Sequence, residues 1–123
     1  MPRFMGLVRM AEGHPPPPQA MIDAMDAFIG EQAGKGVFLD GGGLAAQAET
    51  VNFLVRKGEV TRVDGPYAES KEVVGGWAIM QYDTVEEAVK GQELFAEVHR
   101  EHWPECEFVA TMRQIQDEPP APD

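Results

Sequence analysis

One pattern occurs twice along the chain: an extended apolar run followed by a segment with helical periodicity. In the first half, the run of residues 3–10 precedes four prolines, Pro15 to Pro18, and a helical pattern follows over residues 19–34. Proline cannot donate to a strand ladder or continue a regular element, so we interpret the prolines as a stiff connector rather than a partner-docking motif. The predicted core face of the helix consists of Met21, Ile22, Met25, Phe28, Ile29 and Ala33.

The second half repeats the pattern with sharper boundaries. Residues 77–82 form an extended run, and Thr84 and Glu87 then have the spacing of a capping box, which marks the start of a helix. The helix is predicted to end at about residue 102, before a proline, and residues 107–115 form the last strand. Its predicted core face consists of Val85, Ala88, Val89, Phe95 and Val98.

Two further extended segments lie between these halves. Residues 37–39 are predicted to form a short strand, and residues 50–56 and 59–63 a hairpin around Lys57-Gly58. Glycines 41–43 lack the following Lys-Ser/Thr of a phosphate-binding loop, so they indicate a bulge or a tight turn. The resulting order is strand, helix, strand or hairpin, strand, helix, strand. This order is typical of the ferredoxin-like, split β-α-β class of α+β folds, with both helices on one face of a four-stranded antiparallel sheet.

The length of 123 residues suits one domain, and a hydrophobic content of 43% indicates a globular chain. We predict a domain over residues 1–116. Residues 117–123 are rich in proline and acidic residues, and we expect them to form a disordered tail.

The formal net charge of −11 limits the classes of partner. A field of this sign repels phosphate groups, so we expect neither nucleic acid nor a membrane surface as a partner. No run is long enough to span a bilayer and no signal peptide is evident, which makes the cytoplasm the expected compartment. The single cysteine, Cys106, excludes an intrachain disulfide.

Pleat alternation divides the predicted strand residues between two faces of the sheet. The apolar set, which we assign to the helix side, is Phe4, Val8, Met10, Val51, Phe53, Val55, Phe108, Ala110 and Met112. The mixed set on the opposite face is Met5, Leu7, Arg9, Asn52, Leu54, Arg56, Val109, Thr111 and Arg113. A face with this much apolar area is expected to be covered by a second copy of the chain.

The arginines of the mixed set, Arg9, Arg56 and Arg113, could bind a small carboxylate ligand inside such a covered cavity. The alternative is that they lie at strand ends and pair with the abundant acidic side chains.

Residues 64–72 read Asp-Gly-Pro-Tyr-Ala-Glu-Ser-Lys-Glu, and Gly75-Gly76-Trp77 follow. This stretch resembles the signature of the YCII-related family, also called the DGPF family, with Tyr67 in place of the usual Phe. The resemblance extends from Arg3 to Ile115 and implies a ferredoxin-like fold that forms a dimeric α/β barrel. It implies little about activity. A histidine–aspartate pair has been proposed as catalytic in some members, but this motif contains no histidine, and His14 lies in the proline segment.

The motif supplies the remaining candidate site residues. Asp64 could accept backbone amides across the Gly65-Pro66 turn, or it could act as a general base at the mouth of a pocket. Tyr67 could donate a hydrogen bond to a ligand oxygen. Ion pairing on the turn is the simpler role for Glu69 and Lys71. The predicted ligand-binding residues are therefore Arg9, Arg56, Tyr67, Glu69, Lys71, Trp77 and Arg113.

Two other groups could carry chemistry. His99 and His102 share a helical spacing, but no complete set of metal ligands is visible, and we interpret them as solvated residues at a helix C-terminus. The acidic neighbours of Cys106 should raise its pKa, which argues against a nucleophile. We therefore expect no metal and no cofactor.

Three functions are consistent with these features. The first is a dimeric enzyme with isomerase- or lyase-like proton transfer on a small carboxylate or ketone, with Asp64 as the base and Arg9 as the anion clamp. The second is a non-catalytic metabolite-binding or regulatory module. The third is a fold that only assembles subunits.

Overall fold

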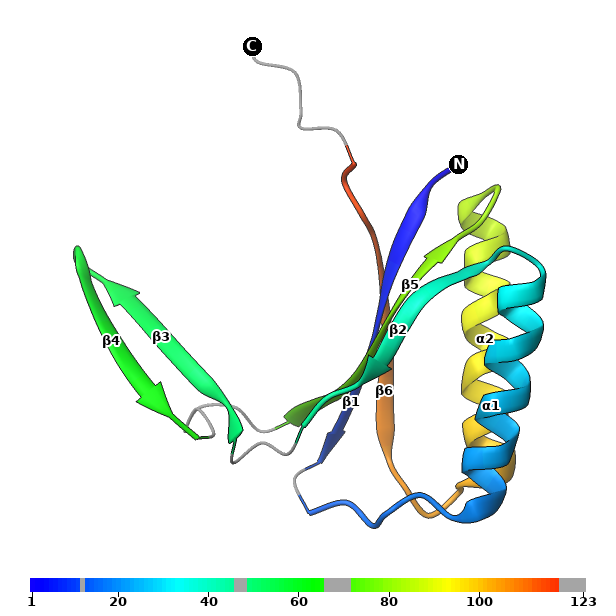
Figure 1. The fold of residues 1–123 in the computed structure, drawn as a ribbon, viewed down its shortest axis with the longest axis horizontal. Coiled ribbons are helices and arrows are strands. Elements are labelled where there is room, and N and C mark those ends of the chain that lie inside the picture. The colour runs from blue at the N-terminus through cyan, green and yellow to red at the C-terminus, as the bar shows by residue number, and fades with distance from the viewer. Residues whose placement is uncertain (12, 46–48, 66–71, 118–123) are drawn as a thin grey trace.

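The computed structural model describes residues 1–11, 13–45, 49–65 and 72–117 (Figure 1). Within them the chain forms six strands and two helices. In chain order these are β1 (Arg3–Ala11), α1 (Gln19–Gly34), β2 (Phe38–Gly43), β3 (Val51–Arg56), β4 (Glu59–Asp64), β5 (Glu72–Gln81), α2 (Val85–His102) and β6 (Phe108–Gln114). The predicted α+β class is confirmed.

Four of the strands form one antiparallel sheet in the order β2-β5-β1-β6. β1 and β2 are both antiparallel to β5, so they are parallel to each other with β5 inserted between them. β5 and β6 are related in the same way through β1. Each β-α-β unit is therefore split by a strand of the other unit, which is the ferredoxin-like arrangement expected from the sequence.

Both helices lie against the same face of this sheet (Figure 1). α1 covers the residues predicted for it, and α2 begins at the expected cap, where the amide of Glu87 donates to Thr84 Oγ1 at 3.1 Å. Neither described helix is long and apolar enough to cross a bilayer.

The predicted core faces of the helices need a partial correction. Val85 and Val89 of α2 and Ile22 of α1 are exposed, although all three were assigned to the core. The buried stripe of α2 instead passes through Ala88, Gly91 and His99, because successive steps of three or four residues stay on one side of a helix.

The buried residues form two clusters at opposite ends of the helix–sheet interface. One cluster, near the start of α2, contains Phe4, Met80, Tyr82 and Ala88. The other, beyond the end of α2, contains Met21, Trp103 and Cys106. The strand residues predicted for the helix side are confirmed in β1 and β6, since Met112 packs against the first cluster and Met10 against the second.

The hairpin departs most from the sequence-based expectation. β3 and β4 form a separate two-stranded sheet that extends away from the rest of the chain (Figure 1). Val51, Phe53 and Val55 are exposed, so their predicted burial under the helices is wrong. The reason is that β2 already occupies the edge of the large sheet beside β5.

β2 is longer than the predicted strand because it includes the three glycines, Gly41 to Gly43. These glycines pair with β5 residues Ala78, Trp77 and Gly76, so the prediction of a tight turn at this position is wrong. A register irregularity is present just before them, between Phe38 and Asp40.

An ion pair joins Arg3, at the start of β1, to Asp117, the last residue that the structure describes. Asp117, the first residue of the expected tail, accepts a hydrogen bond from Arg3 Nε at 2.9 Å. Residues 118–123 lie outside the described residues.

Candidate functional site

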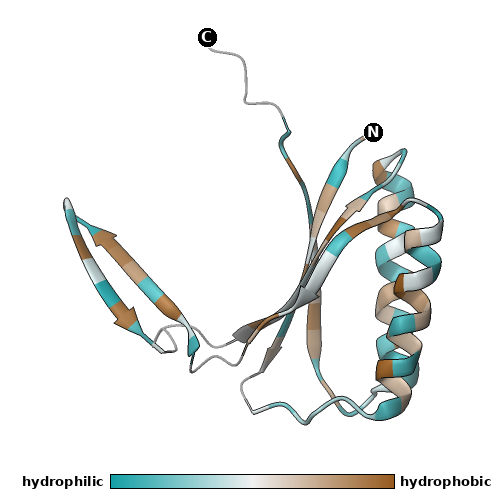
Figure 2. Cartoon of the chain, in the orientation of Figure 1, coloured by the Kyte–Doolittle hydropathy of each residue, from teal (hydrophilic) through white to brown (hydrophobic). Residues whose placement is uncertain are grey.

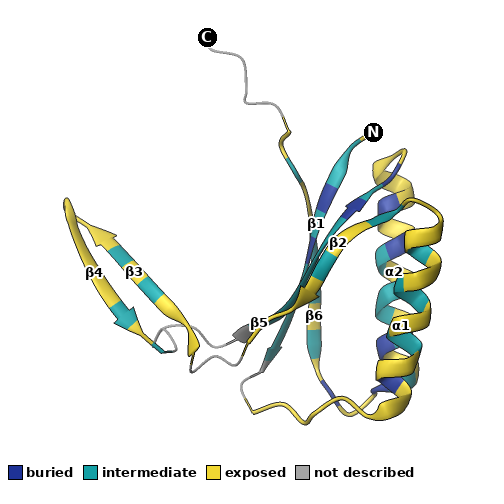
Figure 3. Cartoon of the chain, in the orientation of Figure 1, coloured by how far each residue is buried: buried dark blue, intermediate teal, exposed yellow. Residues whose placement is uncertain are grey.

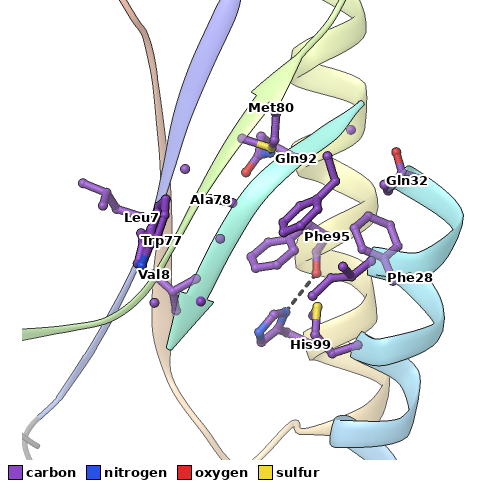
Figure 4. A pocket seen from close by; sticks show the side chains of 18 of the residues that line it. Leu7, Val8, Phe28, Gln32, Trp77, Ala78, Met80, Gln92, Phe95 and His99 are labelled. Carbon is purple, nitrogen blue, oxygen red and sulfur yellow. Dashed lines mark hydrogen bonds between the residues drawn. The ribbon is translucent and has the colours of Figure 1, made fainter. Parts of the chain in front are cut away.

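A cavity of about 440 Å³ lies between the four-stranded sheet and the two helices. Figure 4 shows residues of α1 and α2 on one side of it, and strand residues on the other. Met80 and Tyr82 of the first cluster border it, and so do Met10 and Met25, which pack against the second cluster. The cavity is therefore the unfilled middle of a helix–sheet interface that is closed at both ends.

Glycines form much of the sheet side of the cavity, which is why space remains there. They come from three strands: Gly6 of β1, Gly41, Gly42 and Gly43 of β2, and Gly75 and Gly76 of β5. At Gly41 a side chain is sterically excluded, because a Cβ atom would lie 2.7 Å from the carbonyl oxygen of Trp77 and 2.9 Å from the Phe38 ring. At Gly43 the nearest atom would be 3.9 Å away, so that glycine leaves open space.

The helix side is aromatic and aliphatic, with Phe28 and Ile29 from α1 and Phe95 from α2. The rings of Phe28 and Phe95 have centroids 6.2 Å apart, within the range of favourable aromatic pairs. These side chains would supply most of the apolar contact surface for a bound molecule.

His99 is the one titratable imidazole on the cavity wall among the described residues. Its side chain is only 7% exposed, and its ring lies 4.5 Å from the Phe95 ring and 4.3 Å from the Phe108 ring, centroid to centroid. Nδ1 lies 3.0 Å from the carbonyl oxygen of Phe95 (Figure 4). Because a carbonyl oxygen can only accept, Nδ1 carries the hydrogen, and Nε2 of the neutral ring is left as an acceptor.

Burial lowers the pKa of His99 below 6.5, against the smaller opposing effect of the hydrogen bond to Phe95. The ring is therefore neutral at pH 7. A neutral imidazole with one nitrogen fixed as a donor can accept a hydrogen bond, or a proton, through the other nitrogen.

Three other polar side chains border the cavity: Gln32, Tyr82 and Gln92. Gln92 Nε2 lies 3.1 Å from Met80 Sδ. Burial raises the pKa of Tyr82, although a hydrogen bond from Gln92 lowers it in part, so the phenol stays protonated at pH 7. No described lining residue is Arg, Lys, Asp or Glu, which makes the cavity suitable for an uncharged, largely apolar molecule.

The predicted site residues lie mostly elsewhere. Arg9 and Arg113 belong to strands β1 and β6, where they are opposite Val109 and Met5 respectively. They share the sheet face turned away from the helices, as predicted. Arg113 pairs with Met5, which lies four residues before Arg9 on β1, so the two arginines are roughly 13 Å apart along the strand at about 3.3 Å per residue. The predicted grouping of Arg56 with them is wrong, because Arg56 belongs to the separate hairpin.

Asp64 is exposed at the end of β4, where its carboxylate accepts a hydrogen bond from Arg62 Nε at 2.7 Å. It does not border the cavity. Tyr67, Glu69 and Lys71 lie outside the described residues. Of the predicted site residues that the structure describes, Trp77 alone borders the cavity, and it does so from within β5, because its side chain lies on the face of the sheet turned away from the helices (Figure 4).

The interpretation of His99 as a solvated residue is wrong, since it is buried. The sequence contained a signal for this: Gly91, Phe95 and His99 are spaced by four residues, which continues the core face of the helix. His102 is only half-buried, and its Nε2 lies 3.9 Å from the Glu101 carboxylate.

Cys106 is buried in the second cluster. Burial is the larger cause that raises its pKa, and Glu107 adds to it, so the predicted direction is confirmed. Among the described residues, no three His, Cys, Asp or Glu side chains gather closely enough to hold a metal ion.

Comparison with known proteins adds a family assignment. A family model described as the YCII-related domain matches residues 3–97, from the start of β1 into α2. His99 lies just beyond the matched range. No curated protein matches the chain.

Proposed function

The chain belongs to the YCII-related domain family, and from this premise we propose that it binds a small, largely apolar molecule in the helix–sheet cavity. The observation that carries the proposal is the combination of a cavity of about 440 Å³ with a single buried imidazole on its wall. Small-molecule sites commonly occupy roughly 300–1,000 Å³ and combine apolar walls with a few polar groups that fix orientation.

The chemistry of the wall defines the class of ligand. Phe28 and Phe95 favour a flat or cyclic apolar body, and His99 favours a hydroxyl or N–H group that can donate to Nε2. Gln92 and Gln32 can bind a carbonyl or a second hydroxyl group. A charged molecule would have to lose its hydration without an opposite charge in the cavity, so a neutral ligand is favoured.

Proton transfer on such a ligand is the second candidate function. A neutral His99 can remove a proton from a carbon that lies between a carbonyl group and a carbon–carbon double bond, and return it to the far carbon of that double bond, which shifts the double bond next to the carbonyl group in an isomerase-like reaction. The specific observation in its favour is the hydrogen bond from Nδ1 to the Phe95 carbonyl, which holds the ring and leaves Nε2 unprotonated as the acceptor. This role replaces the one first considered for Asp64, whose carboxylate pairs with Arg62 outside the cavity.

A homodimer of domains spanning residues 1–116 is the proposed state of the protein, located in the cytoplasm. Its support is the apolar content of the sheet face turned away from the helices, where Leu7 and Trp77 are directly opposite each other. Two such faces packed together would form the α/β barrel that the family resemblance implies. Arg9 and Arg113 would then lie at this interface and could bind an anionic group there.

A cavity-filling variant tests the proposed ligand site. Ala78 borders the cavity from β5, so Ala78→Leu would occupy part of its volume, whereas Val109→Leu adds bulk on the opposite face of the sheet. Neutral aromatic and carbonyl compounds that bind the unmodified protein should be found by ligand-observed NMR. They should bind Val109→Leu equally well and Ala78→Leu at least about tenfold more weakly. Equal binding to both variants would place the ligand elsewhere.

The histidine separates binding from proton transfer. His99→Phe keeps the aromatic packing between Phe95 and Phe108 but removes the acceptor nitrogen. If the cavity only binds, His99→Phe should weaken binding of hydroxyl-bearing ligands. If it catalyses, exchange of the ligand's carbon-bound hydrogen with deuterated solvent should occur with the unmodified protein and stop in His99→Phe.

A further inference from the structure

Two polar side chains on the cavity wall, Gln92 and His99, come from the same side of α2. Their positions differ by seven residues, which is close to two full helical turns, so they lie on one face at roughly 10 Å along the axis, at about 1.5 Å per residue. Figure 2 shows hydrophilic residues along both helices, so polarity alone does not distinguish these two. Burial does: His99 is buried and Gln92 half-buried, on the side of α2 that Figure 3 shows turned toward the sheet.

At one end of this pair, the imidazole of His99 projects from α2 toward the strands (Figure 4). Nδ1 donates to the Phe95 carbonyl oxygen, and among the described residues no donor contacts Nε2. No described side-chain nitrogen or oxygen is both fully enclosed and without a partner, so Nε2 remains accessible to a small molecule. A ligand that donates to Nε2 would supply the hydrogen bond that this buried ring lacks.

At the other end, the Gln92 amide crosses the helix–sheet interface. Its Nε2 lies 3.1 Å from Met80 Sδ, and its Oε1 lies 4.0 Å from the position of a Cβ atom built on Gly6 of β1. The nitrogen is therefore paired, whereas no donor within the described part of the chain contacts the oxygen. By the same reasoning as for His99, Oε1 remains accessible. Because a carbonyl oxygen can only accept, this end also requires a donor on the ligand.

The wall between these two acceptors is aromatic. Phe95 lies between Gln92 and His99 on α2, and its ring centroid is 6.2 Å from that of Phe28 on α1. A flat apolar body can pack against these rings. A carboxylate at either end of such a body would meet an acceptor, and no described lining residue is a cation that could offset the loss of its hydration.

We propose that the cavity recognises an elongated, neutral aromatic molecule with a hydroxyl or N–H group at each end, one donating to His99 Nε2 and the other to Gln92 Oε1. Two hydrogen bonds of about 2.8 Å within a span of roughly 10 Å leave roughly 5–10 Å between the two donor atoms of the ligand. Para substituents on a benzene ring provide this spacing, and ortho substituents do not. This inference rests on the ligand binding proposed above, and it adds Gln92 as the second polar contact and the length of the ligand.

Four related compounds test the spacing on the unmodified protein. Para-hydroxyphenethyl alcohol has two donors at opposite ends, and ortho-hydroxyphenethyl alcohol has the same two donors close together. Para-ethylphenol and phenethyl alcohol have one donor each. In titrations followed by ligand-observed NMR, the para alcohol should bind about three- to tenfold more tightly than each of the other three, which is the effect of one additional hydrogen bond.

Three variants test the two contacts. Gln92→Met keeps an unbranched side chain of similar length but removes the amide, and His99→Phe removes the acceptor nitrogen. Glu93→Met introduces the same side chain at an exposed neighbouring position and is the control. In Gln92→Met and in His99→Phe the para alcohol keeps only one contact, so it should bind no more tightly than the better one-donor compound. In Glu93→Met its three- to tenfold advantage should remain.

The outcomes separate this inference from the ligand site on which it rests. Equal binding of the para alcohol and the one-donor compounds to the unmodified protein would overturn the paired contacts, and so would an advantage that persists in Gln92→Met. If Ala78→Leu still weakens binding in these cases, the cavity remains the ligand site. If none of the four compounds binds, this inference is wrong, and the ligand site then stands only if another neutral compound binds and Ala78→Leu weakens it. Compounds that bind Ala78→Leu and the unmodified protein equally would overturn the site itself.

Discussion

Nδ1 of His99 lies 3.0 Å from the carbonyl oxygen of Phe95, one helical turn earlier on α2. This bond would ordinarily favour the protonated ring, yet burial outweighs it and the pKa is lowered. The imidazole is therefore held in one orientation and one tautomer without being charged.

The first prediction concerns the pH dependence of stability. Since the pKa of His99 is lowered in the fold, the unfolded chain binds a proton more readily just below pH 6.5. Stability should therefore be fully present above that pH and should decrease as the pH falls through the lower, folded-state pKa. The slope contributed by this one group is at most about 1.4 kcal/mol per pH unit.

Urea unfolding at a series of pH values measures this slope. His99→Phe should lose the part of it that lies just below pH 6.5, whereas His102→Gln, at a half-buried position on the last turn of the same helix, should keep it. An unchanged slope in His99→Phe would show that other groups cause the pH dependence.

The second prediction compares two helical glycines. A Cβ atom at Gly91 would lie 2.1 Å from the Tyr82 hydroxyl oxygen, whereas at Gly30 of α1 nothing lies within 4 Å. Gly91→Ala should destabilise the fold by about 1–3 kcal/mol through overpacking. Gly30→Ala should be neutral or stabilising by about 0.5–1 kcal/mol, because alanine is the better helix former.

Thermal and urea unfolding of both variants measure the difference. Tyr82→Phe removes the hydroxyl that would clash, so it should recover part of the loss in a Gly91→Ala, Tyr82→Phe double variant. If Gly91→Ala is as stable as Gly30→Ala, α2 does not approach Tyr82 as closely as described.

The third prediction concerns the glycine run of β2. Gly41→Ala would bring a Cβ atom within 2.9 Å of the Phe38 ring and 2.7 Å of a backbone oxygen that cannot move alone, whereas the Cβ atom of Gly43→Ala would make only an ordinary contact, 3.9 Å from the Gly75 carbonyl oxygen. Gly41→Ala should therefore lower the free energy of unfolding by about 1–3 kcal/mol, and Gly43→Ala by less than about 1 kcal/mol. Urea titrations of the two variants decide between this steric role and a general need for flexibility, which would affect both equally.

The sequence predicted the sheet and the helices well, because both rest on local signals. Hydrophobic periodicity over 19–34 and the Thr84–Glu87 spacing gave the helix bounds, and the alternation in β1 and β6 gave the correct helix-side residues. The hairpin was placed in the wrong sheet because Val51, Phe53 and Val55 alternate in the same way as a core-facing strand. Alternation identifies an apolar face but does not identify the surface that covers it.

The cavity could not be predicted because it depends on glycines, which have no side chain, at matching positions of several strands. Gly6, Gly41 and Gly75 are distant in sequence, and only the pairing of β1, β2 and β5 brings them to one wall. His99 could have been found from its spacing to Phe95. A histidine near a helix end can be either solvated or buried, however, and the burial of His99 depends in part on Phe108 of β6, which is distant from the helical pattern.

The fourth prediction concerns the single thiol. Cys106 is buried with Met21 and Trp103, and burial together with Glu107 raises the pKa of the thiol above 9.0. A thiol that is both protonated and covered reacts slowly, because the thiolate is the nucleophile. In the native protein at pH 8, labelling by a disulfide reagent should be at least about tenfold slower than in denaturant. Met21→Ala would open the cover over Cys106 and should accelerate labelling, whereas Ile22→Ala, at an exposed neighbouring position, should not. Fast labelling of the unmodified native protein would mean that the end of α2 opens frequently, and the second cluster would then not close that end of the cavity.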